Sequence, residues 1–159
     1  MSILLQLYNS KIREFAERPL PVPQGEPSAE RKLENVFCGD QVTIRASLRD
    51  GVYQDLSGSV DGCLLCRAAT AWLLENGEGL TPEAATRLQT DLDAFLEGRL
   101  AAAEMLWHGL EMFSPLVAYR NRRKCVLLPF KALAQLGCVS MVEQRKPEPQ
   151  AMKGTSATQ

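Results

Sequence analysis

No stretch of this sequence stays apolar over the roughly 20 residues that a membrane-spanning helix needs, so we expect no membrane segment. The first seven residues are apolar, but they lack the basic segment and the cleavage pattern of a signal peptide. These absences favour a cytoplasmic protein.

The sequence also lacks an excess of charge of either sign. Its net charge is −1, which gives no electrostatic reason to expect binding to nucleic acid or to an anionic membrane. Hydrophobic residues make up 45% and charged residues 23%, which is ordinary for a globular domain. A chain of 159 residues can bury one core. We therefore expect one domain over residues 1–142, followed by a polar, disordered tail over 143–159.

Histidine is almost absent, whereas cysteine is not. The one histidine, His108, follows Trp107 in an expected helix, and we interpret it as lying at the edge of a packed face rather than as a metal ligand. Five cysteines are an odd number in a chain expected to be cytoplasmic, where disulfides are rare. Metal binding or thiol chemistry is therefore the favoured use of these residues.

Apolar periodicity predicts an α+β fold, with a small antiparallel sheet and helices packed on one of its faces. The expected strands cover residues 33–37, 42–48 and 52–60. The expected helices cover residues 3–17, 63–75, 100–112 and 124–136, with a further helix that begins after Thr81 as N-cap and ends near Gly98.

The hairpin between the second and third strands can close in two ways. A two-residue loop at Asp50 and Gly51 would put the apolar side chains of the two strands on opposite faces. A three-residue loop with a left-handed Gly51 would pair Leu48 with Val52 and bring the apolar side chains to one face. The pattern therefore predicts the three-residue loop, with a glycine bulge.

Three cysteines and one aspartate lie at joints between these elements. Cys38 and Asp40 are two residues apart in an extended stretch, so their side chains can point the same way, and Gly39 lets the backbone bend. Cys63 and Cys125 lie near expected helix starts, where the helix dipole favours a thiolate. Three thiolates and one carboxylate suit a tetrahedral site for zinc or iron.

Each of these residues also has a simpler interpretation. A buried cysteine is more often an inert small hydrophobe, and Asp40 could instead stabilise a turn. Cys66 follows Cys63 at a redox and zinc spacing, but we favour a core position for it. Lys124 could neutralise thiolate charge or lie in a solvated basic turn. Cys138 is interpreted as incidental.

These motifs resemble the IscU/NifU family of iron–sulfur cluster assembly scaffolds, most closely its SufU branch. The matching residues are Cys38-Gly39-Asp40, Gly62-Cys63 and Arg122-Arg123-Lys124-Cys125. The likeness to SufU rests on a long helical insertion, about residues 77–112, and on Lys124, which stands where IscU-type members carry a histidine.

The resemblance implies a scaffold for cluster assembly, or a zinc-dependent sulfur acceptor, rather than a free-standing enzyme. A SufS-like or IscS-like cysteine desulfurase would supply persulfide sulfur, and iron–sulfur acceptor proteins would take the product. Zinc or a transient iron–sulfur cluster would be held by Cys38, Cys63 and Cys125, with Asp40 completing the metal ligands. Cys38, on a loop beside Gly39, is the first candidate to carry the persulfide, and Cys125 is the second.

Two other functions are compatible with some of these residues. The chain could be a structural zinc protein that binds partners without sulfur chemistry. A thiol–disulfide oxidoreductase using Cys63 and Cys66 is disfavoured, because no βαβ pattern of the thioredoxin kind surrounds the pair.

Overall fold

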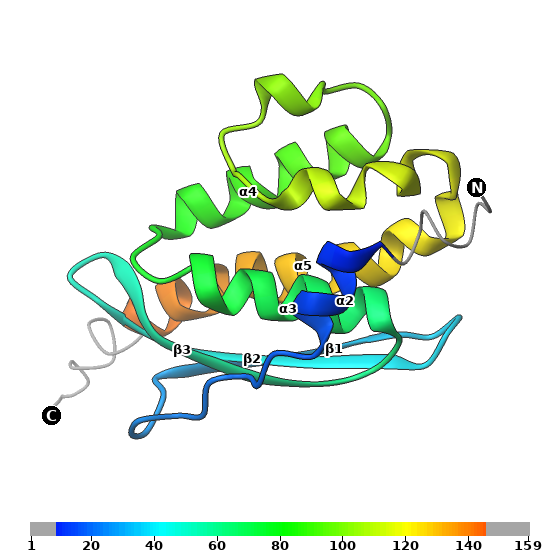
Figure 1. Ribbon diagram of the computed structural model, residues 1–159. Helices are drawn as coiled ribbons and strands as arrows, with labels where there is room; N and C mark the ends of the chain where they lie inside the picture. Colours follow the sequence, from blue (N-terminus) through cyan, green and yellow to red (C-terminus); the bar gives the residue numbers. More distant parts are fainter. Residues whose placement is uncertain (1–8, 146–159) are drawn as a thin grey trace, which may run out of the picture.

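The computed structural model describes residues 9–145; residues 1–8 and 146–159 lie outside the described part. A three-stranded antiparallel sheet of order β1-β2-β3 carries helices on one face (Figure 1), which confirms the expected α+β fold. In chain order the elements are α2 (Ser10–Ala16), β1 (Ala29–Asn35), β2 (Asp40–Arg49), β3 (Val52–Asp61), α3 (Leu64–Asn76), α4 (Pro82–Leu96), the 3₁₀ helices η1 (Ala102–Glu104) and η2 (Leu110–Ala118), and α5 (Arg120–Arg145).

The core lies between the sheet and the helices α3 and α5, and α4 packs on α5 on the side away from the sheet (Figure 1). The inward side chains of β2, Val42 and Ile44, are 0% exposed. They meet the apolar faces of α3 and α5, where Leu65 and Leu133 are also buried. Burial of these side chains is the main stabilising term of the fold. It fixes the start of α3 and the first turns of α5 over one end of the sheet.

The β2–β3 hairpin closes through a two-residue loop. Asp50 and Gly51 have φ values of 57° and 78°, the left-handed pair that such a loop needs. Arg49 therefore pairs with Val52 and Leu48 with Tyr53. The expected three-residue loop, with Leu48 opposite Val52, is wrong.

The bulge that the apolar pattern required lies inside β3. Asp55 has a φ of 57°, and the register between β2 and β3 shifts beside it. This extra residue lets Tyr53 and Leu56, on either side of Asp55, both be buried, at 0% and 4% exposed. The Glu78 carboxylate accepts hydrogen bonds from the backbone N–H groups of Asp55 and Leu56, at 2.9 and 3.2 Å. The hairpin thus keeps one apolar face although its loop is short.

Other element boundaries also differ from those expected. The expected helix over 100–112 is wrong: η1 and η2 take its place, and η2 continues through Pro115. Gly109, with a φ of 101°, reverses the chain between them. The first strand begins at Ala29 and ends at Asn35, earlier than expected.

The helix α4 lies inside the expected insertion, and α5 extends into the start of the expected tail. Thr81 caps α4 as expected, since its side chain accepts a hydrogen bond from Ala84 N–H. The segment 77–112 thus contains α4 and η1. α5 begins at Arg120 and continues to Arg145, so most of the expected disordered tail lies outside the described residues. No helix in the described part of the chain has the length and apolar character needed to span a membrane.

Candidate metal centre

The four residues proposed as ligands come from four places that meet at one end of the sheet. Cys38 lies on the loop between β1 and β2, and Asp40 is the first residue of β2. Cys63 is the N-cap of α3. Cys125 is the sixth residue of α5 rather than near its start, because that helix begins four residues earlier than expected.

A turn built on Asn35 sets the position of Cys38. The Asn35 side-chain oxygen accepts a hydrogen bond from Phe37 N–H at 3.1 Å, and its backbone oxygen accepts from Cys38 and Gly39 at 3.3 and 2.7 Å. Gly39 has a φ of 79°, which a side chain would disfavour. The turn leaves Cys38 exposed and turns Asp40 inward, where it is 3% exposed.

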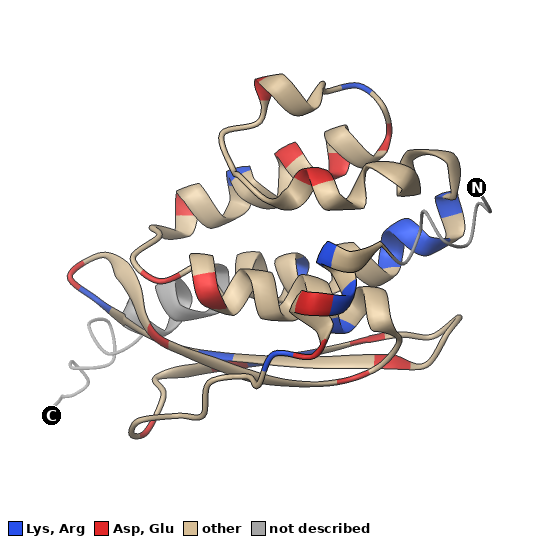
Figure 2. Cartoon of the chain, viewed as in Figure 1, with Lys and Arg blue, Asp and Glu red and all other residues tan. Residues whose placement is uncertain are grey.

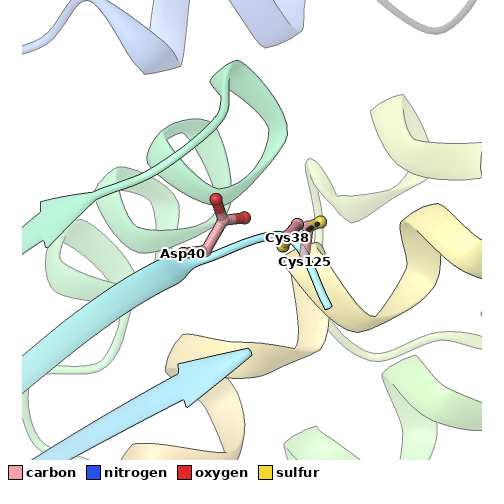
Figure 3. A group of neighbouring side chains, drawn as sticks. All are labelled: Cys38, Asp40 and Cys125. Atoms are coloured by element: carbon pink, nitrogen blue, oxygen red, sulfur yellow. Dashed lines mark hydrogen bonds between the residues drawn. The ribbon is translucent and has the colours of Figure 1, made fainter. Parts of the chain in front are cut away.

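Cys38, Asp40 and Cys125 form a compact group of possible ligands. One ligand atom from each lies within 4.8 Å of the others. The Cys38 and Cys125 Sγ atoms are 3.7 Å apart, and Figure 3 shows these two side chains next to each other, with Asp40 on the adjoining start of β2. Two sulfur atoms and one carboxylate oxygen form a donor set that zinc and iron accept.

The Asp40 carboxylate supports this assignment. Its Oδ1 accepts a hydrogen bond from Cys63 N–H at 3.1 Å, so Asp40 also fixes the start of α3. Its Oδ2 is buried without a hydrogen-bond partner among the described residues. A buried carboxylate oxygen with no partner is costly, and a bound cation would remove that cost. The residues present therefore fit a metal ion.

Cys63 adjoins this group without belonging to the set of three. A hydrogen bond with Cys125 lowers the pKa of the Cys63 thiol to about 7, although burial and the nearby Asp40 carboxylate act in the opposite direction. The same bond, followed by burial, raises the pKa of Cys125. The pair thus favours a thiolate on Cys63 and a thiol on Cys125, which places Cys63 ready to act as a fourth donor.

Other candidates from the sequence lie outside this group. Cys66 is 0% exposed, and burial raises the pKa of its thiol, so it is an inert core residue, as favoured. Among the described residues, His108 is exposed between η1 and η2 and is not part of the ligand group. The side chain of Cys138 lies outside the described part. Lys124 is exposed, and its Nζ lies 4.8 Å from the centre of the Phe37 ring.

A pocket of about 520 Å³ opens beside the two adjacent sulfur atoms. The sequence did not predict that Asn35, Phe37 and Asn121 would line this pocket. Of these, Asn35 could have been found, since asparagine commonly fixes a turn through its side chain. The pocket is lined by Asn35, Phe37, Cys38, Asn121, Arg122, Lys124 and Cys125.

Gly62 provides the space that the Asp40 carboxylate occupies. A Cβ on Gly62 would lie 2.8 Å from both Cγ and Oδ1 of Asp40, so the carboxylate would have to move. We expect Gly62→Ala to weaken metal binding by about 10- to 100-fold, as loss of a group that orients a ligand commonly does. Titration with zinc against a chromophoric chelator measures the change. The control is Gly25→Ala, because nothing lies within 4 Å of that added Cβ; equal affinities in the two variants would contradict this role.

Known proteins resemble this chain in both sequence and structure. No protein-family model matches it. It is 22% identical over 135 residues to the iron–sulfur cluster assembly scaffold protein IscU of Streptococcus pyogenes serotype M1, covering 85% of each chain. It is 26% identical over 102 residues to the protein of that name in Thermotoga maritima, covering 64% of this chain and 71% of that one.

Two solved structures have the same fold. The N-terminal part of a nitrogen-fixing NifU-like protein from Brucella abortus gives a TM-score of 0.80 at 28% identity, over 91% of this chain and 99% of that one. A putative SUF-system scaffold protein from Fervidobacterium islandicum gives 0.75 at 22% identity, over 83% and 97%. In sequence and in fold, the chain is therefore similar to the IscU, NifU and SufU scaffold proteins.

Proposed function

We propose that this protein is a scaffold in iron–sulfur cluster assembly, on which Cys38 receives sulfur from a cysteine desulfurase. One observation carries the proposal: the exposed Cys38 thiol lies 3.7 Å from the buried Cys125 thiol, in a group that also contains the Asp40 carboxylate. The relatives from Streptococcus pyogenes and Thermotoga maritima, whose names give this function, support it. The protein would act in the cytoplasm and pass its product to iron–sulfur acceptor proteins.

The metal set of this proposal is Cys38, Asp40, Cys63 and Cys125. The first, second and fourth already lie together, and Cys63 is adjacent and inclined to the thiolate form. Zinc or a transient iron–sulfur cluster would share these ligands, since both accept thiolates in tetrahedral arrangements. Bound there, zinc would keep the thiols deprotonated and a cluster would be the cargo.

We expect the more solvent-exposed of the two adjacent thiols, that of Cys38, to receive the sulfur. The Cys38 thiolate would attack the outer sulfur of the donor's persulfide; a new S–S bond forms on Cys38, the donor's own S–S bond breaks, and the donor leaves as a thiolate. No further oxidant is needed. Cys38 is exposed, whereas Cys125 is 2% exposed, so Cys125 would act after Cys38. Arg122 and Lys124, on the wall of the same pocket, would offset the negative charge.

The alternatives have less support. A purely structural zinc site is closed, whereas here one ligand faces solvent. A redox pair of Cys63 and Cys66 needs a reachable second thiol, and Cys66 is 0% exposed. We also propose that residues 77–112 are an insertion of the SufU kind within a domain spanning 1–142; α4, which belongs to this segment, packs on α5 away from the sheet.

Persulfide should appear first on Cys38 when the protein is mixed with a cysteine desulfurase and L-cysteine. Alkylation of the trapped persulfides, followed by peptide mass spectrometry, locates the added sulfur. Cys38→Ser should abolish early labelling, whereas Cys66→Ser should leave it unchanged because Cys66 is buried. Sulfur found only on Cys66 or Cys138 would overturn the assignment and favour the redox pair.

A further inference from the structure

One face of α5 carries three cations that form no ion pair among the described residues. Arg120, Lys124 and Lys131 lie at positions i, i+4 and i+11, which one helix face brings together, with Leu127 between them at i+7. Figure 2 shows Lys and Arg gathered over the first turns of α5, and acidic residues spaced along α4.

This face forms one wall of a groove of about 570 Å³ between α5 and α4. Several charged groups of the groove already have partners within the protein. The Glu97 carboxylate pairs with Arg99 at 2.6 Å, and the Arg123 guanidinium donates to the backbone oxygens of Leu116 and Val117. Asp93 is then the acidic group of the groove that forms no ion pair among the described residues. The unpaired charges of the groove are thus the three cations of α5 and the Asp93 carboxylate. The groove is therefore positive, although the whole chain has a net charge of −1.

Lys124 links the groove to the pocket beside the proposed sulfur-accepting thiol of Cys38, because it lines both. Its Nζ lies 4.8 Å from the Phe37 ring centre. Phe37 and its neighbour Val36 are 83% and 79% exposed. Large apolar side chains this exposed, beside a site and rimmed by polar groups, indicate a surface that a partner covers.

We propose that the basic groove (Arg120, Lys124 and Lys131), together with Val36 and Phe37, is the docking surface for an acidic segment of the sulfur donor. This inference rests on the proposed function. The acidic segment would lie along the groove, and an apolar patch of the donor would cover Val36 and Phe37, so that the donor's persulfide meets Cys38. Complementary charge of this kind mainly raises the association rate, and added salt screens it.

The test uses a double charge reversal at positions outside the proposed metal ligands. In Arg120→Glu/Lys131→Glu, sulfur transfer from a purified SufS-type desulfurase with L-cysteine should slow by about tenfold or more at low salt, because association loses its steering. Transfer to the parent protein should slow as salt rises. The matched control is Arg13→Glu/Lys32→Glu, which reverses two exposed cations on α2 and β1 that line neither the groove nor the pocket beside Cys38. It makes the same change in charge, and we expect it to change the rate by less than about twofold.

A small donor separates this inference from the proposed function. Glutathione persulfide needs no docking surface, so it should label Cys38 equally fast in the parent and in the groove variant. That result also shows that the variant is folded and its thiol is competent. A groove variant that accepts sulfur from the desulfurase as fast as the parent overturns the docking surface and leaves the proposed function standing. Failure of both donors to label Cys38 in the parent overturns the proposed function, and the docking surface with it.

Discussion

Cys125→Ser should remove stoichiometric metal from the purified protein. Cys125 lies at the centre of the site: its Sγ is 3.7 Å from that of Cys38, and it belongs to the ligand group with Cys38 and Asp40. A serine hydroxyl is a poor substitute for a thiolate toward zinc or iron. Metal analysis of the as-purified protein, with a visible spectrum to distinguish zinc from a coloured cluster, measures the loss.

Further cysteine variants serve as controls and test whether Cys63 is a fourth metal ligand. Cys66→Ser changes a thiol that is outside the ligand group and buried, so this variant should keep its metal, as should Cys138→Ser. Cys63→Ser should also abolish stoichiometric metal if Cys63 is the fourth ligand. Equal metal content in Cys125→Ser, Cys63→Ser and Cys66→Ser would show that the metal binds elsewhere.

The sequence predicted the parts of the site that are set locally. Cys38 and Asp40 were expected close together on an extended stretch, and they do lie in one ligand group. The expected reason is wrong: Gly39 has a φ of 79° and forms a turn that leaves Cys38 exposed and directs Asp40 inward. Cys63 was correctly placed at a helix start, since Gly62 precedes an apolar helical pattern. These positions depend on backbone geometry over a few residues, which sequence patterns report well.

The sequence was less informative where distant contacts decide the structure. Cys125 was expected near a helix start, but α5 begins at Arg120, and the polar run before Cys125 does not mark that boundary. The expected helix over 100–112 fails because Gly109 takes a φ of 101° and Trp72, from α3, donates a hydrogen bond to the His108 backbone oxygen. The hydrophobic periodicity of the sequence predicts neither the backbone conformation of Gly109 nor the hydrogen bond from Trp72.

The hairpin shows the same limit within the sheet. The apolar pattern correctly required one extra residue, but it could not say whether that residue lay in the loop or in the strand. Asp55 takes the left-handed conformation within β3, where the Glu78 carboxylate, from beyond α3, accepts its N–H. A partner 23 residues away therefore fixed the register, and the loop kept two residues.

Asp40→Ala should slow the release of bound cargo, whether zinc or a cluster. The Asp40 oxygen is the hard donor among soft sulfurs, so it is the ligand that an incoming acceptor displaces most easily. Without it, release has to begin with the departure of a thiolate. We expect transfer to an apo acceptor protein, or to a chelator, to become about tenfold slower or more, since each 1.4 kcal/mol of added barrier slows a rate tenfold.

The Asp40→Asn variant separates the ligand role from the structural role. Asparagine keeps a side-chain oxygen that can accept the 3.1 Å hydrogen bond from Cys63 N–H, but it has no carboxylate charge to offer a metal. If the buried, unpartnered Oδ2 is the labile ligand, both Asp40→Asn and Asp40→Ala should retain cargo longer than the parent protein. If Asp40→Asn releases cargo as fast as the parent and only Asp40→Ala differs, Asp40 acts by shaping the start of α3 and is not a ligand.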